Sequence, residues 1–434
     1  MKYKLSKYNY SLSGTNSTLL YNCASDGLLV LVPQLVELIE QNAEQLEHIK
    51  DIHEDLFYAL DSKGFIASEE KDEIESFIDR LKEEENSPAK FSMIINPTMD
   101  CNLRCWYCYE NHTLGTVMSP TVIESIKKLI QKKLDNPELK ELHISFFGGE
   151  PLIQFRKVIQ PILECAIVGC DEHNVKLGVS FTTNGVLLNE ELIDWLKPIN
   201  EKQLIGWQIT LDGYKELHDK SRRTIDLRPT YDTIIKNIKS LVKRGMTVTV
   251  RFNYTTESLE SFVDVLQDFE DLSEEEHRQI HFDFQQVWQA NRIDEDIVKS
   301  IKTFFLQENF EVGLEQVASR YRCYADKESD IVVNYNGDLY KCTAREFNRG
   351  LREGVLLENG ELVWNNLYER RMSVKYANSI CKACKIYPLC FGGCSQRQLE
   401  REQTDSCPRK LSEEDKDKML RTRALWILQQ QNKT

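Results

Sequence analysis

The segment KFSMIINPTMDCNLRCWYC, residues 90–108, decides the fold. Its apolar first half, residues 90–98, is typical of a buried strand. Its second half carries three closely spaced cysteines, Cys101, Cys105 and Cys108. Thiolates this close in sequence converge on one soft metal centre, and three of them leave one iron of a four-iron cluster open to another ligand. The competing interpretations are a zinc site, which needs a fourth ligand nearby, and buried free thiols.

Strand and helix patterns alternate after this segment. The predicted strands are residues 90–98, 141–147, 176–182, 203–210, 246–255 and 279–288. Amphipathic helices lie between most of them, such as residues 119–134, which begin at a predicted N-cap, Ser119, and residues 230–245, which end at Gly245. This alternation predicts a parallel sheet with crossover helices. Since six strands are fewer than the eight of a closed barrel, we expect a partial (βα)6 TIM-like barrel over residues 91–310.

Two regions flank the predicted barrel. Residues 1–90 combine short apolar segments with amphipathic stretches and end in the charged segment KEEENSPAK, which predicts a small α/β module followed by a linker. Residues 311–434 lack the alternation and contain seven cysteines with little apolar mass between them. We expect bound metal to hold this third region together.

Composition narrows the class of protein. The chain has 434 residues, of which 41% are hydrophobic and 29% charged, so it is long enough for several domains and has the balance of a globular protein. Its 55 Lys and Arg residues against 69 Asp and Glu give a net charge of −14, which argues against binding to nucleic acid or to a membrane surface. The polar N-terminus is unlike a signal peptide, and no apolar run reaches the roughly 20 residues of a membrane span. We therefore predict a cytoplasmic location, no nucleic-acid partner and no membrane partner.

Thirteen cysteines are the unusual part of the composition. A disulfide scaffold would be short and secreted, so the tight cysteine spacings in this chain predict metal binding. A second group of cysteines follows the predicted barrel: Cys323, Cys342, Cys381, Cys384, Cys390, Cys394 and Cys407. Cys165 and Cys170 lie in an apolar helix and are expected to be small core residues, and Cys23 is assigned no role.

The first cysteine motif, with Tyr107 before its last cysteine, resembles the signature of the radical S-adenosylmethionine enzymes. The resemblance implies that the amino and carboxylate groups of S-adenosylmethionine chelate the open iron. Reductive cleavage of this cofactor would then yield a 5′-deoxyadenosyl radical that abstracts hydrogen from a substrate. A flavodoxin-like or ferredoxin-like protein would deliver the electron.

Residues at the ends of the following strands extend the resemblance. GGEP, residues 148–151, follows the second predicted strand; its glycines let backbone carbonyls approach a ligand, and its carboxylate could pair with an ammonium group. TTNG and ITLDG end the next two strands, and HDKSR follows. The resemblance implies cofactor contacts by Tyr107, Gly148, Gly149, Glu150, Asn184, Thr210 and Arg222. Thr210 stands where the family commonly has serine, and Asp212 and His218 are interpreted as turn or capping residues.

The second cysteine group resembles the seven-cysteine motif of the SPASM domain, which holds two auxiliary 4Fe–4S clusters in peptide-modifying radical enzymes. The outer cluster would use Cys381, Cys384, Cys390 and Cys407, and the inner cluster would use Cys323, Cys342 and Cys394. Together with the radical cluster, the resemblance implies three 4Fe–4S clusters. A module with two zinc ions is the alternative, because thiolates suit zinc equally well.

The inner cluster has one cysteine too few. Some relatives supply the fourth ligand from a cysteine shortly after the first, but the segment after Cys323 is YADKESD. The cluster would either keep an open iron, which could bind a substrate thiolate, or take an oxygen ligand. The candidates for that ligand are Asp326, Glu328 and Asp330.

The start of the chain resembles that of peptide maturases, whose winged-helix-like N-terminal module grips the leader of a ribosomally made precursor peptide. A sheet edge beside a helix groove is a suitable peptide clamp. We predict such a maturase, with residues 1–90 as the leader-recognition module, residues 91–310 as the radical SAM barrel and residues 311–434 as the SPASM domain. It would install a cross-link, with a thioether slightly favoured over a carbon–carbon or carbon–oxygen link because of the missing inner ligand. No catalytic acid or base is predicted.

Two other function classes remain open. An anaerobic sulfatase-maturating enzyme would oxidise Ser or Cys to formylglycine; such enzymes usually begin close to the first motif and carry an aspartate base after the second SPASM cysteine, where this chain has Thr343. A non-enzymatic iron–sulfur or zinc protein could bind peptides without chemistry. Such a protein should lack the strand-end residues Glu150, Asn184 and Arg222.

Overall fold

The chain divides into two compact units. The computed structural model describes residues 2–203, 205–313, 322–401 and 406–431, so that Leu204, within a predicted strand, lies outside the described residues. The barrel unit comprises residues 87–313 and 328–368. The terminal unit comprises residues 1–86, 314–327 and 369–434, and so contains both ends of the chain.

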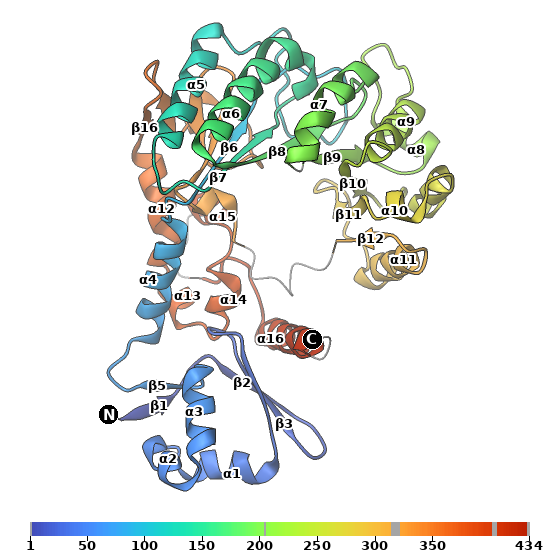
Figure 1. The fold of residues 1–434 in the computed structure, drawn as a ribbon. Coiled ribbons are helices and arrows are strands. Elements are labelled where there is room, and N and C mark those ends of the chain that lie inside the picture. The colour runs from blue at the N-terminus through green and yellow to red at the C-terminus, as the bar shows by residue number, and fades with distance from the viewer. Residues whose placement is uncertain (1, 204, 314–321, 402–405, 432–434) are drawn as a thin grey trace. The chain divides into compact units, whose positions relative to one another are not determined.

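An eleven-stranded sheet forms the barrel unit (Figure 1). Its six central strands are β6 (Lys90–Ile95), β7 (Glu141–Phe146), β8 (Lys176–Thr183), β9 (Ile205–Leu211), β10 (Thr247–Tyr254) and β11 (Ile280–Gln286). They pair in parallel and in chain order. Each lies within or close to one of the six predicted segments, which confirms the predicted partial (βα)6 barrel.

Helices cover the outer face of this curved sheet (Figure 1). They are α5 (Pro120–Leu134), α6 (Gln160–His173), α7 (Glu190–Lys202), α8 (Lys215–Ser221), α9 (Tyr231–Val242), α10 (Glu274–His277) and α11 (Glu295–Gln307), with shorter or tighter turns at η2 (Pro151–Gln154), η3 (Phe155–Ile159) and η4 (Glu260–Phe269). The predicted N-cap is confirmed, since the Ser119 hydroxyl accepts a hydrogen bond from Val122 N at 3.3 Å. Helices and sheet share one apolar core, in which Phe181 stacks between Phe146 and Trp207.

Short strands extend both sides of the six-stranded sheet. β12 (Glu311–Val312) pairs with β11, and β13 (Asp330–Val333) pairs in parallel with β6. β14 (Asp338–Tyr340), β15 (Gly354–Leu356) and β16 (Leu362–Trp364) continue the sheet as antiparallel strands, with the turn η7 (Arg349–Leu351) between β14 and β15. None of these strands is among the predicted ones, because strands this short show no period in the sequence.

The terminal unit combines an N-terminal α/β module with the C-terminal helices. The module comprises β1 (Tyr3–Leu5), β2 (Asn9–Ser13), β3 (Thr18–Asn22), β4 (Gly27–Leu31), α1 (Pro33–Gln41), η1 (Leu46–His48), α2 (Ile49–Ile52), α3 (Glu54–Ser62), β5 (Ile66–Ser68) and α4 (Glu73–Glu85). The C-terminal part comprises η6 (Tyr324–Asp326), most of α12 (Asn366–Ala377), α13 (Ser379–Ala383), α14 (Tyr387–Cys390), α15 (Ser395–Leu399) and α16 (Glu413–Gln431). β2, β3 and β4 form an antiparallel sheet, and β1 pairs with β5.

Both faces of the three-stranded sheet are covered. Leu20 and Leu29 pack into an apolar cluster with the residues of α1 to α3. Tyr21 and Leu28, which point to the opposite face, belong to a cluster that includes Leu420 of α16. The last helix of the chain therefore completes the core of the first module.

A buried network of charges joins α4 to the C-terminal part of the terminal unit. Lys375 Nζ lies 2.8 Å from Glu85 Oε1, and both side chains are about one-twentieth exposed, at 5% and 6%. Arg322 also pairs with Glu85. The Tyr376 hydroxyl donates a hydrogen bond to Glu85 Oε2 at 2.6 Å. One buried carboxylate therefore pairs with the buried Lys375 and with the partly buried Arg322.

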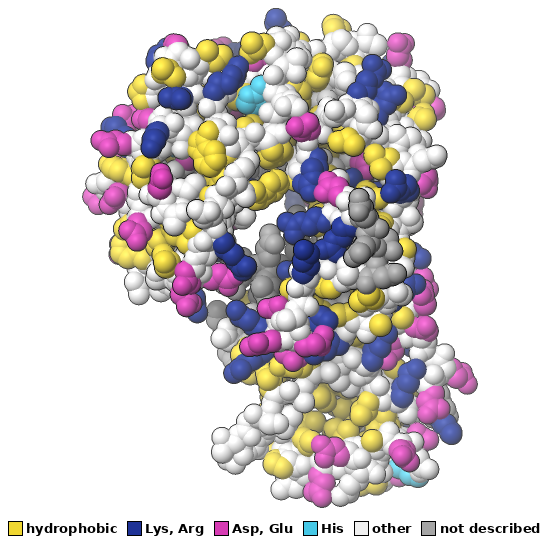
Figure 2. All heavy atoms as spheres, turned by 180° about the vertical axis from the view of Figure 1, so that it is seen from behind, with side chains coloured by type: hydrophobic (Ala, Val, Ile, Leu, Met, Phe, Trp, Pro, Cys, Tyr) yellow, Lys and Arg dark blue, Asp and Glu magenta, His cyan; other side chains and the backbone are white. Residues whose placement is uncertain are grey.

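Acidic and basic side chains are interspersed on the face of the molecule shown in Figure 2. This mixture accords with a sequence that is rich in both signs of charge and has a net charge of −14. Across the parts of the chain that the structure describes, no helix combines the length and the apolar character that crossing a membrane requires.

Substitution Glu85→Gln should lower the free energy of unfolding of the terminal unit by about 3–5 kcal/mol, because it leaves buried Lys375 without its counter-charge and removes one of the two carboxylates beside Arg322. Glu84→Gln is the matched control: Glu84 lies 3.5 Å from Arg322, but its side chain is 63% exposed. We expect that change to cost at most about 1 kcal/mol. Urea denaturation measures both values, and equal losses would contradict the assigned network.

Candidate functional site

The carboxyl ends of the six parallel strands meet at one edge of the barrel sheet. The loop with Cys101 follows β6, the GGEP turn follows β7, and Asn184 follows β8. Asp212 follows β9, and Asn253 lies near the end of β10. Because the strands pair in chain order, these loops are neighbours, and the same edge carries the sites of parallel α/β proteins in general.

The thiols of the first motif lie in an environment that disfavours their ionisation. Burial is the main cause that raises the pKa of Cys101 to about 12, and the nearby Glu150 carboxylate adds to it. Burial also raises the pKa of Cys105, while the Arg222 guanidinium opposes that shift. A bound metal centre would supply the positive charge that these thiols need in order to ionise. The donor set therefore fits an iron–sulfur cluster.

His112 follows this motif closely. Its Nε2 lies 3.4 Å from Cys108 Sγ. Sequence reasoning did not single it out, although a histidine four residues after a metal-binding cysteine is a recognisable signal. In the described ranges of the chain, no group of three or more His, Cys, Asp or Glu side chains has an arrangement that could hold a single metal ion.

The GGEP turn is pressed against the start of the cysteine loop. Gly149 has φ of +50°, and a Cβ atom there would lie 2.2 Å from the Asp100 carbonyl oxygen, so only glycine fits. Glu150 N donates a hydrogen bond to the same carbonyl at 2.8 Å. The glycines predicted from the motif therefore bring the ends of β6 and β7 into contact.

Both oxygens of the Glu150 carboxylate accept hydrogen bonds from other residues of the chain. Its Oε1 accepts hydrogen bonds from Thr183 Oγ1 at 2.7 Å and from Leu152 N at 3.1 Å. Its Oε2 accepts from Asn184 N at 2.8 Å. Burial raises its pKa, and these bonds oppose the rise. Glu150 thus fixes the end of β8 to the GGEP turn, and its predicted contact with a cofactor amino group stays a prediction.

Glu110 is a second carboxylate beside this turn. Its Oε2 accepts a hydrogen bond from Gly149 N at 2.7 Å, while its Oε1 is buried without a hydrogen-bond partner. Burial raises its pKa to about 7. Glu110 carries no sequence signal beyond its place two residues after Cys108.

The Tyr107 hydroxyl is the centre of a buried polar cluster. It donates to Asp212 Oδ1 at 2.8 Å and accepts from Arg222 Nη1 at 2.7 Å and Asn253 Nδ2 at 3.1 Å. The side chains of Arg222 and Asp212 are 9% and 3% exposed. Burial raises the pKa of Asp212 to about 6, and the Arg222 charge opposes that shift. The cluster joins the cysteine loop to the ends of β9 and β10.

His218 supports this cluster from behind. Its Nδ1 accepts a hydrogen bond from Asp212 N at 3.3 Å, and its Nε2 lies 3.1 Å from Thr230 Oγ1. Thr230 Oγ1 in turn donates to the Arg222 carbonyl at 2.6 Å. Burial and the Arg222 charge lower the pKa of His218, so the ring stays neutral and acts as a structural brace.

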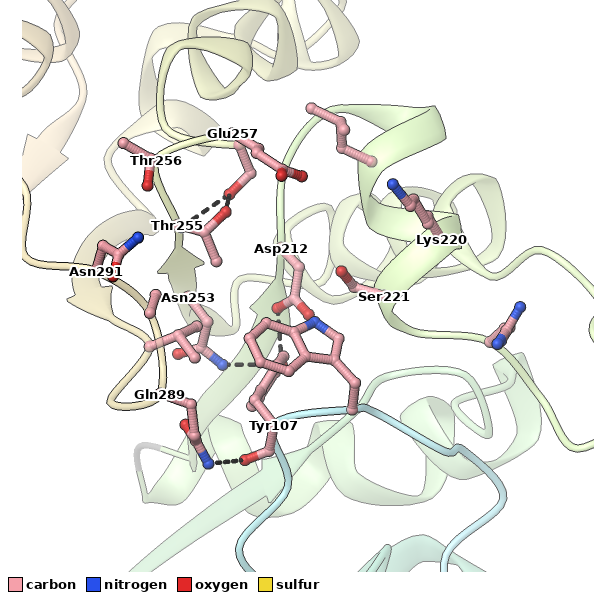
Figure 3. A pocket seen from close by; sticks show the side chains of 16 residues that line it. Tyr107, Asp212, Lys220, Ser221, Asn253, Thr255, Thr256, Glu257, Gln289 and Asn291 are labelled. Atoms are coloured by element: carbon pink, nitrogen blue, oxygen red, sulfur yellow. Dashed lines mark hydrogen bonds between the residues drawn. The ribbon is translucent and has the colours of Figure 1, made fainter.

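A cavity of about 480 Å³ opens beside Tyr107 (Figure 3). It is lined by Trp106, Tyr107, Asp212, Leu217, Lys220, Ser221, Arg223, Asn253, Thr255, Thr256, Glu257, Ser258, Val287, Gln289, Ala290 and Asn291. Tyr107 and Asn253 point toward one another, and Gln289 Nε2 donates to the Tyr107 carbonyl at 2.9 Å (Figure 3). Asp212 lines this cavity and Arg222 does not, and Asp212 Oδ2 and Arg222 Nε are both buried without a hydrogen-bond partner.

Asn253 and Gln289 were missed by sequence reasoning, although both lie at or just beyond the ends of predicted strands. Two residues named from the sequence do not line this cavity: Asn184 Nδ2 donates to Asn102 Oδ1 at 2.7 Å, and Thr210 is a buried residue of β9. Of the residues expected to contact a cofactor, Tyr107 is the one in the cavity wall.

The four cysteines predicted for the outer cluster all belong to the terminal unit. Burial raises the pKa of Cys381 to about 12, and the nearby thiols of Cys390, Cys407 and Cys384 add to this rise. Cys23 is fully buried in the same unit and donates a hydrogen bond from Sγ to the Lys385 carbonyl at 3.2 Å. Cys381 lies in α13 and Cys390 ends α14. Thiols suit an iron–sulfur cluster, and the outer cluster stays a prediction.

The three cysteines predicted for the inner cluster are divided between the units. Cys323 is the N-cap of η6, and Cys394 is the N-cap of α15, both in the terminal unit. Cys342 follows β14 in the barrel unit.

Comparison with known proteins matches residues 95–269 to the model of the Radical SAM superfamily. The chain is 27% identical over 272 residues to the radical SAM cyclopropyl synthase TigE of Paramaledivibacter caminithermalis. The aligned region covers 55% of this chain and 53% of TigE, so the chain matches about half of the length of that relative. It is 23% identical over 361 residues to a cysteine-type anaerobic sulfatase-maturating enzyme of Clostridium perfringens, which covers 72% of this chain and 91% of that enzyme.

Solved structures share the fold. The structure of Streptococcus suis SuiB bound to precursor peptide SuiA matches with a TM-score of 0.52 and 15% identity, and covers 94% of this chain and 100% of SuiB. The structure of anSMEcpe with bound AdoMet and the Cp18Cys peptide matches with a TM-score of 0.59 and 19% identity, and covers 78% of this chain and 99% of that chain.

Substitution Tyr107→Phe should lower the free energy of unfolding of the barrel unit by about 1–3 kcal/mol, because buried Asp212 and Arg222 lose the hydroxyl between them. Tyr109→Phe is the matched control in the same loop, where the hydroxyl donates to the Thr343 carbonyl at 2.9 Å. No buried charge depends on that bond, so we expect a loss of about 1 kcal/mol or less. A larger loss for Tyr109→Phe in urea denaturation would show that the cluster is not the main polar tie.

Proposed function

We propose, because residues 95–269 match the model of the Radical SAM superfamily, that the chain is a maturase of a ribosomally made precursor peptide. It abstracts hydrogen from a residue of that peptide and installs a cross-link. A radical SAM domain implies one 4Fe–4S cluster and S-adenosylmethionine; two auxiliary clusters and a flavodoxin-like or ferredoxin-like electron donor belong to the proposal. A thioether is the favoured link if the inner auxiliary cluster keeps an open iron.

The arrangement of the cysteine loop and the adjacent cavity carries this proposal. Cys101, Cys105 and Cys108 would hold the cluster, and the chemistry supplied there is reductive cleavage of S-adenosylmethionine to a hydrogen-abstracting radical. Arg222 contributes positive charge beside Cys105, which favours the thiolate form that a cluster needs. The Tyr107 cluster closes the side of the cavity next to this loop, which keeps the positions of Asp212 and Asn253 fixed.

The N-terminal module favours the maturase over the sulfatase-maturating alternative. The likeness to SuiB, whose structure was solved with a precursor peptide, extends over 94% of this chain, whereas the likeness to anSMEcpe extends over 78%. The module of residues 1–86 is a folded part of the terminal unit. Its edge strand β4 has an outward-facing Val30 that is 56% exposed, which suits β-strand addition by an extended leader peptide.

Thr343 is the second observation against the alternative. It stands directly after Cys342, where sulfatase-maturating enzymes are expected to carry an aspartate base, and its hydroxyl has no comparable basicity. The Thr343 carbonyl accepts the hydrogen bond of Tyr109, so this position also fixes the cysteine loop.

Co-expression with each small open reading frame of its own gene neighbourhood tests the maturase proposal. We expect one of the encoded peptides to lose the mass of two hydrogen atoms for each modification, as measured by mass spectrometry. An unmodified set of peptides, together with formylglycine formed on a sulfatase peptide, would favour the sulfatase-maturating alternative.

Cleavage of S-adenosylmethionine by the reduced protein under anaerobic conditions distinguishes an enzyme from a protein that binds peptides without chemistry. Cys101→Ala, Cys105→Ala and Cys108→Ala should each abolish 5′-deoxyadenosine formation. A four-iron cluster with one open iron needs all three thiolates to hold its other irons. Cys165→Ala is the matched control, since Cys165 lies on α6 away from the loop. Activity that survives in the first three variants would refute the assignment of the radical cluster.

A further inference from the structure

One carboxylate beside the first cysteine motif has a buried oxygen that no donor of the described chain reaches. Glu110 follows Cys108 by two residues, and its Oε1 is buried without a hydrogen-bond partner among the described residues. Its other oxygen, Oε2, accepts a hydrogen bond from Gly149 N at 2.7 Å. A buried acceptor without a donor costs free energy, so this atom calls for a specific partner.

The cationic side chains near Glu110 in the sequence have other partners. Arg104 is the nearest Lys or Arg along the chain, and its Nη1 donates to two backbone carbonyls of the cysteine loop. His112 Nε2 lies 3.4 Å from Cys108 Sγ. Among the described residues, no Lys, Arg or His side chain pairs with Glu110. The missing donor is therefore one that the described chain does not supply.

The Glu110 carboxylate lies close to a thiol of the first motif. Burial raises the pKa of Cys108 to about 11, and the Glu110 carboxylate adds to that rise, while a hydrogen bond from Glu110 N opposes it. Because the effect of one charge on another falls with distance, this influence places the carboxylate near Cys108 Sγ. A group bound to a cluster on these thiols would thus be a neighbour of Glu110.

Glu110 and Glu150 are the two carboxylates at the GGEP turn, and they differ in how far their oxygens are occupied. Glu150 accepts three hydrogen bonds within the chain, and both of its oxygens take part. Glu110 accepts one, from Gly149 N, which also fixes its side chain on the turn. Of these two carboxylates, Glu110 is the one with an oxygen available to a ligand.

The cofactor that a radical SAM domain implies has a suitable donor. An open iron binds nitrogen and oxygen ligands, and the amino-acid end of S-adenosylmethionine offers one of each in a single chelate. At that end the amino group has N–H bonds to donate, whereas the carboxylate and the sulfonium have none. The unpaired Oε1 beside the thiols therefore fits the amino group.

We propose that Glu110 Oε1 accepts a hydrogen bond from the amino group of S-adenosylmethionine bound at the first cluster. Glu110 is then a cofactor-binding residue, while Glu150 holds the turn in shape. This assignment rests on the proposed function insofar as that function places the cluster on Cys101, Cys105 and Cys108. It does not depend on the peptide or on the bond that is made.

The test measures equilibrium binding of S-adenosylmethionine to the full chain, reconstituted anaerobically with its clusters. In Glu110→Gln the side-chain amide must turn its oxygen to Gly149 N, which leaves its NH2 group, a donor, in the place of Oε1. We expect the dissociation constant to rise roughly 10- to 100-fold, as for the loss of a hydrogen bond to a charged group. The iron content should equal that of the parent.

Glu141→Gln is the matched control. Glu141 begins β7, the strand that the GGEP turn follows, and its carboxylate lies 3.0 Å from Lys90 Nζ at the amino end of β6. This variant loses the same charge at the opposite end of the same two strands. Its affinity for S-adenosylmethionine should match that of the parent.

Binding of 5′-methylthioadenosine separates a direct contact from a structural role. This compound has the adenosine and the sulfur of the cofactor but no amino-acid end. Its affinity for Glu110→Gln should equal its affinity for the parent. An unchanged affinity of Glu110→Gln for S-adenosylmethionine, or equal losses for both compounds, would overturn the proposal.

A crystal structure of the parent with S-adenosylmethionine does not depend on a variant that folds. We expect the amino nitrogen within hydrogen-bond distance of Glu110 Oε1, at about 3.2 Å or less. An amino group bonded only to other residues would overturn the proposal. A parent that binds no S-adenosylmethionine would overturn it together with the assignment of the first cluster, whereas cofactor binding without modification of any peptide would overturn the maturase function alone.

Discussion

Parallel pairing of six consecutive strands is the constraint on which the site depends. Because β6 to β11 follow one another in the sheet in chain order, each loop that leaves a strand lies next to the loop before it. The Asp100 carbonyl can therefore receive Glu150 N, Glu150 can receive Asn184 N, and the contacts propagate from loop to loop. If these strands had another order in the sheet, the same residues would lie on loops that are not neighbours, and these contacts could not form.

Burial of charge is the second constraint on the site. The Tyr107 hydroxyl gives each of two buried charges a hydrogen-bond partner. Arg222 and Asp212 are both almost fully buried, yet their closest atoms are 3.8 Å apart, longer than a hydrogen bond. The phenol bridges that gap by donating to the acid and accepting from the base, so each charge keeps a bonded partner. The arrangement still leaves Asp212 Oδ2 and Arg222 Nε unpaired. Each of these unpaired buried atoms costs free energy, which the hydrogen bonds of the phenol offset in part.

The sequence allowed the barrel and the edge that carries the site to be predicted, but not the partners of each side chain. Strand segments and strand-end motifs have strong local signals, whereas the pairing of β13 with β6 and the packing of α16 on the first module depend on contacts between distant segments. Glu150 shows the same limit within a motif. Its type and position were predicted, yet its hydrogen bonds with Thr183 and Asn184 could be known only once β8 was placed beside it.

If the chain is a peptide maturase, the bond that it makes depends on which atoms of the peptide its site brings close to the reacting centre. The cavity beside Tyr107 is the described space next to the first cysteine loop. Its wall is polar at Asp212, Asn253 and Gln289, and side chains of this kind can orient a peptide backbone through hydrogen bonds. How this wall presents the peptide would therefore decide which bond forms.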